Sequence, residues 1–183
     1  MANRRATAVV FGFDFQVNAA IVLMLENIKE LDSLRLEGNY EVIELKLTDD
    51  TYILAKAKAV VDSSSDFRKV RKNLKKALGS LSEGAAKVNT RKLILITNSP
   101  NPFNDDASRS AFWGPAQRDY STLPPSSKAL VDEYLKDIDK PLDAEKYMVQ
   151  VLPLETDYDT ERYKAVLSAI DNFVGTLIIN ITG

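Results

Sequence analysis

Apolar and polar side chains alternate along two neighbouring segments, residues 40–47 and 52–60. A period of two places successive side chains on opposite faces of a β-strand. Residues 48–51, Thr-Asp-Asp-Thr, supply side chains that favour a tight turn between the two strands. The second strand carries alanines on one face, which predicts close packing against a helix, and Lys56 and Lys58 on the other. The pattern therefore predicts a β-hairpin.

The two acidic residues of the first strand fall on different faces in this pattern. Glu41 shares a face with Ile43, whereas Glu44 shares the opposite face with Val42. A slip of one residue in the strand pairing would exchange the two faces.

The segments outside the hairpin predict helices and further strands. An apolar stretch that is hydrophobic nearly all round is typical of a buried helix, and Asp14 is its expected N-cap. The predicted helices are 15–31, 66–79 (ended by Gly79), one from Ser126 or Ser127 to about Ile138, and one beginning at Asp159; the predicted strands are 92–97 and 146–154, and 98–127 is expected to be loop. Helices flanking a short mixed sheet indicate an α/β sandwich, expected as a single domain over 1–183.

The composition narrows the chemistry that is available. The 183 residues are 45% hydrophobic and 27% charged, as in a globular domain, and include neither cysteine nor histidine. Disulfides, thiol catalysis, histidine-based triads and Cys/His zinc sites are therefore excluded. Carboxylate, lysine, tyrosine and serine chemistry remains, together with metals held by oxygen.

The net charge of −2 gives no overall attraction to nucleic acid, so any DNA contact must come from a local basic patch. The predicted helix 66–79 offers one, and its cations are Arg68, Lys69, Arg71, Lys72, Lys75 and Lys76. They form either an ordinary solvated helix face or a set of phosphate contacts. The position of this helix directly after the strand of Lys58 favours phosphate contacts.

No apolar run looks long enough to span a membrane, and no cleavable leader follows Arg4 and Arg5. We therefore expect a cytoplasmic protein without a membrane partner.

An acid on one strand of a hairpin and a lysine on the other form the skeleton of a metal-dependent nuclease site. Glu41 and Glu44 are the candidate ligands for Mg²⁺ or Mn²⁺, which lowers the pKa of attacking water. Lys58 is the candidate for orienting that water or for offsetting charge on the phosphate. The alternative is an amphipathic hairpin whose charged side chains are only solvated.

Several segments together resemble a known family. They are Gly12-Phe13-Asp14-Phe15-Gln16 with the apolar helix that follows, Glu37-Gly38, the acidic strand 41–44, the Ala-x-Ala-Lys-Ala strand, ILITNSPNPF and MVQVLPL. They resemble the effector nuclease domain of bacterial anti-phage systems, the PD-(D/E)xK-type double-stranded DNA endonucleases fused to SAVED sensor domains in CBASS, with relatives in Lamassu and Avs systems.

The resemblance implies a restriction-endonuclease-like sandwich, with a central mixed sheet, a hairpin carrying the site and helices on both faces. It also implies Mg²⁺-dependent cleavage of double-stranded DNA, triggered by a sensor domain or partner subunit, in an oligomeric assembly. Lys58 matches the motif lysine of the family, and Gln16 matches the glutamine at the start of its first helix.

Two positions depart from the family pattern. Val42 stands where the family usually has aspartate, and valine cannot bind a metal. Lys56 stands where the family has glutamine or glutamate, and its cation would repel Mg²⁺ or contact a phosphate instead. Glu44 shares the face of Val42, so it is a better substitute ligand than Glu41.

Three functions follow from these residues. The first is an active DNA endonuclease domain. The second is a catalytically inactive nuclease fold used for DNA binding, oligomerisation or assembly with a partner. The third is an unrelated α/β interaction domain.

Overall fold

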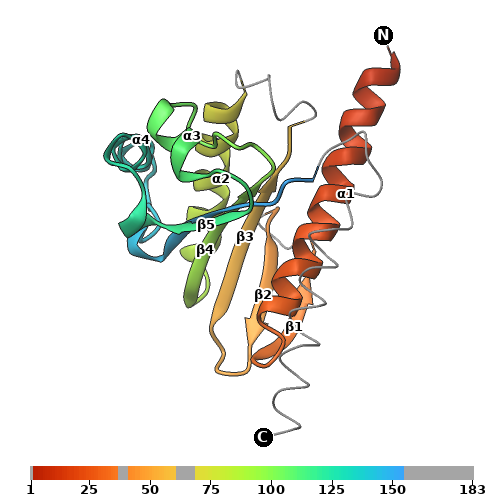
Figure 1. Cartoon of the computed structure of the whole chain (residues 1–183). Helices are drawn as coiled ribbons and strands as arrows, with labels where there is room; N and C mark the ends of the chain where they lie inside the picture. Colours follow the sequence, from red (N-terminus) through yellow and green to blue (C-terminus); the bar gives the residue numbers. More distant parts are fainter. Residues whose placement is uncertain (1, 37–40, 61–68, 155–183) are drawn as a thin grey trace, which may run out of the picture.

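The computed structural model describes residues 2–36, 41–60 and 69–154 (Figure 1). Its elements are α1 (Ala2–Glu26), β1 (Leu31–Arg35), β2 (Ile43–Leu47), β3 (Tyr52–Lys58), α2 (Val70–Ala85), β4 (Thr90–Thr97), α3 (Asp106–Ala111), β5 (Ala116–Asp119), α4 (Pro125–Lys136) and β6 (Tyr147–Val151), with 3-10 turns at Tyr120–Thr122 and Ala144–Lys146. The described strands form one six-stranded sheet in the order β1-β2-β3-β4-β6-β5. The predicted α/β class is therefore confirmed.

The sheet is mixed. β1, β2 and β3 pair antiparallel, β3, β4 and β6 pair parallel, and β5 pairs antiparallel with β6. The predicted hairpin is confirmed as β2 and β3, with Glu44 opposite Leu54. At its turn, the Asp49 carboxylate accepts hydrogen bonds from the backbone N–H and the hydroxyl of Thr51. The two other predicted strands are confirmed as β4 and β6, which lie side by side.

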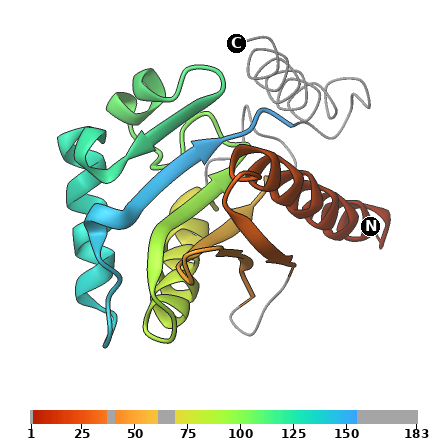
Figure 2. The same ribbon diagram turned by 90° about the horizontal axis from the view of Figure 1, so that it is seen from below.

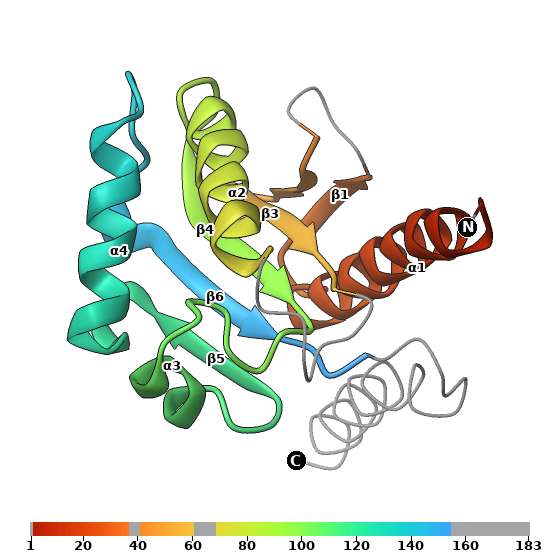
Figure 3. The same cartoon turned by 90° about the horizontal axis from the view of Figure 1, so that it is seen from above.

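Helices cover both faces of the sheet (Figures 2 and 3). α2 and α4 bury Leu74, Leu78 and Val131 against one face, in a core cluster that also holds Val42 and Leu54. α1 covers the other face of the sheet, where its buried apolar side chains form a second core cluster. Central strands buried on both faces explain the continuous apolar run of β4.

The alanine face of β3 packs against α1, as the sequence predicted. Ala55 is fully buried in one cluster with Phe15, Ala19 and Ile43. Small side chains on the strand let the helix lie close to the sheet.

Three predicted helix ends are wrong, and one of them is the end of the first helix, which stops at Glu26 rather than at residue 31, where β1 begins. α1 begins at Ala2, so Asp14 lies inside the helix and is not an N-cap. α2 continues through Gly79 to Ala85. Leu81 is fully buried against the sheet, and that packing outweighs the roughly 1 kcal/mol that glycine costs within a helix.

Segment 98–127 is not all loop, because it contains α3 and β5. α3 begins where the Asp105 side chain accepts a hydrogen bond from the Ser108 backbone N–H. β5, of sequence Ala-Gln-Arg-Asp, is an edge strand without apolar alternation, so no strand could be predicted there from the pattern. The edge strand β1 was missed for the same reason. The predicted helix from Asp159, together with Glu37-Gly38 and Arg68, lies outside the described residues.

α1 is longer and more apolar than the sequence reading allowed. Its stretch Ala8–Glu26 has a mean hydropathy of 1.9. By length and composition alone, this stretch is long and apolar enough to cross a membrane. Phe15 and Leu23 of this stretch are buried against the sheet, and a core helix passes the same test. Towards the N-terminus the helix runs past the sheet, where Val9 and Phe13 are exposed (Figure 1).

Candidate functional site

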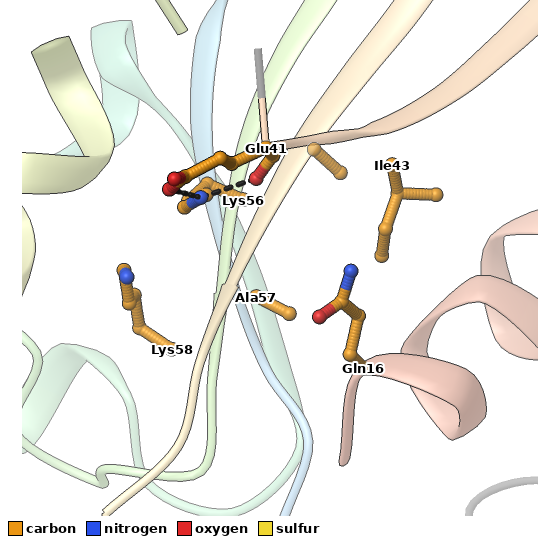
Figure 4. A pocket seen from close by; sticks show the side chains of 7 residues that line it. Gln16, Glu41, Ile43, Lys56, Ala57 and Lys58 are labelled. Atoms are coloured by element: carbon orange, nitrogen blue, oxygen red, sulfur yellow. Dashed lines mark hydrogen bonds and ion pairs between the residues drawn. The ribbon is translucent and has the colours of Figure 1, made fainter. Parts of the chain in front are cut away.

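A pocket of about 430 Å³ lies beside the C-terminal half of β3, between that strand and α1 (Figure 4). β2 pairs with β3 only as far as Ile43 opposite Ala55, so the edge of β3 from Lys56 to Lys58 faces the pocket instead of β2. The lining residues are Gln16, Glu41, Ile43, Ala55, Lys56, Ala57 and Lys58. The structure therefore brings together four residues that the sequence singled out: Gln16, Glu41, Lys56 and Lys58.

Lys56 is the central charge of the pocket. Its side chain is almost fully buried, and its ammonium donates a hydrogen bond to the Glu41 backbone carbonyl. The same Nζ lies 3.3 Å from Oε2 of the Glu41 carboxylate. A buried ammonium needs such partners, since an unpaired charge is very costly to desolvate. Lys56 and Glu41 thus neutralise each other inside the site.

Glu41 does not lie where the strand alternation placed it. Its backbone φ is 54°, in the left-handed region, and it precedes the first residue of β2. This turn directs both its carbonyl and its carboxylate to Lys56 rather than along the face of Ile43 (Figure 4). The sequence carried no signal for it, because glutamate is uncommon in this conformation.

Glu44 does not join the pocket. It lies on β2 opposite Leu54, and its Oε1 is buried without a hydrogen-bond partner among the described residues. Val42, its neighbour on the same face, is buried in the apolar core. The two carboxylates expected to share a metal are therefore held apart.

The described residues do not fit a Mg²⁺ or Mn²⁺ site. They include no group of three or more acidic side chains placed to bind a metal. The Lys56 ammonium contacts Oε2 and the backbone carbonyl of Glu41, and its positive charge would repel a divalent cation there.

Lys58 is half-buried at the end of β3. Burial lowers the pKa of its amine, and the positive charges of Lys56 and Lys76 lower it further, against a small opposing effect of Glu41. Lys58 also lines a small cavity with Asn73 of α2. The end of β3 and one side of α2 therefore concentrate positive charge.

The cations of α2 divide into two groups. Arg71 donates hydrogen bonds to the carbonyls of Phe103 and Asn104, and Lys75 forms an ion pair with Asp137 at 2.6 Å. These two stabilise contacts within the protein. The other described cations are exposed and spaced along the side of the helix nearer Lys58; they are Lys69, Lys72 and Lys76.

Comparison with family models, with curated proteins and with solved structures gives no match for this chain. The resemblance to anti-phage nuclease domains therefore rests on the sequence segments quoted for it.

Proposed function

We propose that this domain binds double-stranded DNA through the backbone phosphates and has lost metal-dependent cleavage. The observation that carries the proposal is the Lys56 ammonium bound to both oxygen groups of Glu41, where cleavage would need a divalent cation.

The charge distribution supports phosphate binding at this end of the sheet. Lys76 of α2 is close enough to Lys58 of β3 to lower the pKa of the Lys58 amine, and Lys72 and Lys69 extend the same basic side. Lysine contacts to phosphates give affinity without sequence preference. With a net charge of −2, binding would be confined to this patch.

The resemblance to anti-phage effector domains supplies the biological setting of the proposal. In that setting, a sensor domain or partner subunit brings the domain to DNA within an oligomeric assembly, and the restriction-endonuclease-like sheet serves as a platform rather than a catalyst.

An active Mg²⁺-dependent endonuclease is the second candidate. It is favoured by the half-buried amine of Lys58, whose lowered pKa suits proton transfer, in one pocket with Gln16 and Glu41. Activity would require Lys56 to leave Glu41 and Glu44 to turn into the pocket.

Binding to a fluorescent 30-base-pair duplex tests the proposal. We expect the same affinity with and without EDTA. A Lys72→Glu/Lys76→Glu variant should bind at least tenfold more weakly, and its plot of log affinity against log salt should be shallower by about 2 because two phosphate contacts are lost. Lys87→Glu is the matched control, since Lys87 is exposed beyond the far end of α2. Absence of binding, or binding that EDTA abolishes, would overturn the proposal.

Incubation with plasmid DNA and Mg²⁺ or Mn²⁺ separates the two candidates. We expect no cutting by the native chain, and cutting by Val42→Asp/Lys56→Gln would identify a lost metal site. Metal-dependent cutting by the native chain that Lys58→Ala abolishes would instead establish the second candidate.

A further inference from the structure

Among the described residues that line the pocket of Figure 4, the positive charge exceeds what their one carboxylate can neutralise. Lys56 and Glu41 form one ion pair, which leaves the charge of Lys58 in excess within this lining, and Lys76 of α2 lies near enough to act on Lys58. Burial is the largest cause of the lowered pKa of Lys58, and the positive charges of Lys56 and Lys76 lower it further. An anion placed among these groups would remove the repulsion.

The shape of the pocket limits which anion fits. Small apolar side chains, Ala55 and Ala57, form part of its wall, and the unpaired edge of β3 leaves it open on the side away from β4. Figure 4 shows Gln16 on α1 on one side of the space and Lys58 on the other. An amide donor and an ammonium therefore approach the space from two different elements.

We infer that this pocket binds a phosphate monoester, such as the phosphorylated end of a DNA strand, without a metal ion. The inference rests on the proposed DNA binding and assigns the pocket to the strand end and the exposed cations of α2 to the duplex. Lys58 would bind the phosphate oxygens directly, and the Gln16 amide would donate a hydrogen bond from α1. Lys56 would add positive charge while it stays paired with the Glu41 carboxylate.

The charge of the ligand distinguishes a strand end from an internal phosphate. A terminal phosphate carries about −1.5 to −2 at pH 7, whereas an internal phosphodiester carries only one negative charge, so the terminal phosphate gains more from Lys58 and the cations near it.

Matched oligonucleotide duplexes test the inference. One carries a 5′-phosphate, one a 3′-phosphate and one hydroxyl groups at all ends, and each is titrated at pH 7 in EDTA. We expect one phosphorylated duplex to bind about tenfold more tightly than the unphosphorylated duplex, since charge-assisted hydrogen bonds are gained. Lys58→Met should abolish this preference, and Lys87→Met should retain it.

The pH dependence gives a second readout. Phosphate binding favours the ammonium form of Lys58, so the preference should decline as pH rises through the lowered pKa of Lys58, before an ordinary lysine would titrate. A thermal melt confirms that Lys58→Met is folded.

The outcomes separate this inference from the proposed function. Equal affinity for all three duplexes overturns the inference and leaves DNA binding in place. A preference that survives Lys58→Met also overturns it, because the phosphate would then bind elsewhere. Absence of binding to any duplex overturns both.

Discussion

The folded protein disfavours the charged form of the Lys58 side chain. Its amine is half-buried and lies near two other ammonium groups, so its pKa in the folded protein is lowered from 10.5. Below the lowered pKa, Lys58 is protonated in both the folded and the unfolded protein. The folded protein then bears the full free-energy cost of the half-buried charge. Between the lowered pKa and 10.5, the unfolded chain binds more protons, so the free energy of unfolding rises with pH.

Lys58→Met should therefore stabilise the protein at neutral pH. The amine is partly screened by solvent, so we expect a gain of about 0.5–1 kcal/mol in the free energy of unfolding. The gain should shrink as pH rises through the lowered pKa of Lys58. Urea unfolding at pH 7 and pH 10 measures both effects, with Lys87→Met as the control. A loss of stability at pH 7 would contradict the explanation.

At this scale the sequence singled out four residues that the structure gathers in one pocket, but it misplaced the side chain of Glu41. Val42 and Lys56 were recognised as unsuited to a metal, and Lys56 and Lys58 do lie at the end of their strand. The left-handed backbone of Glu41 was not predictable, because it depends on a buried ammonium that needs a carbonyl and a carboxylate together. Glu44, the expected substitute ligand, lies opposite Leu54 and does not line the pocket that the hairpin forms with α1.

Among the elements, α1 shows the sharpest contrast between a packed and a free surface. Phe15 is almost fully buried against the sheet and its ring centroid lies 6.4 Å from that of Phe11. Phe13, two residues earlier on the same helix, is 58% exposed. Phe15 and Phe13 therefore allow the same substitution to be compared at a buried and at an exposed position of one helix.

Phe15→Ala should lower the free energy of unfolding by about 3–5 kcal/mol, because it removes a large buried side chain and leaves a cavity. Phe13→Ala should change it by no more than about 0.5 kcal/mol. Chemical denaturation monitored by circular dichroism compares the two variants. Equal effects would mean that α1 does not pack on the sheet as described.

Elements with strong periodicity were predicted well, and those defined by packing were not. The hairpin and the apolar strands β4 and β6 follow from their patterns alone. The extension of α2 past Gly79 depends on the sheet beneath it, which a local pattern does not contain.

Across the whole molecule, Asn98 ties together three segments far apart in sequence. Its side chain accepts a hydrogen bond from the Val60 backbone N–H and donates to the Val60 carbonyl, both at 2.8 Å, and donates to the Leu154 carbonyl at 3.0 Å. Val60 follows β3, Asn98 follows β4 and Leu154 follows β6. One buried amide thus secures the ends of the three parallel strands.

Asn98→Ala should lower the free energy of unfolding by about 3 kcal/mol, since buried backbone groups lose their partners. Native-state hydrogen exchange should show the Val60 amide losing protection. Asn18→Ala is the control, because within the described part of the chain the Asn18 side chain donates a hydrogen bond to the Asp14 carbonyl one turn earlier in α1. A Val60 amide that stays protected would show that Asn98 is not needed to hold these strands.

The α/β class was predictable at this scale, but the strand order was not. β6 inserts between β4 and β5 although β5 precedes it in the chain. Only long-range pairing decides that order, and the short polar strand β5 has no pattern of its own.

This order of strands has a consequence during synthesis. β1 to β4 are neighbours in the sheet in the same order as in the chain, so they can pair as they emerge from the ribosome. β4 gains its second neighbour only when β6 is made, roughly fifty residues later, which at about 5–20 residues per second takes several seconds. During that interval a nascent chain holds an apolar strand edge open, and strand-to-strand aggregation is then a greater hazard than in the finished fold.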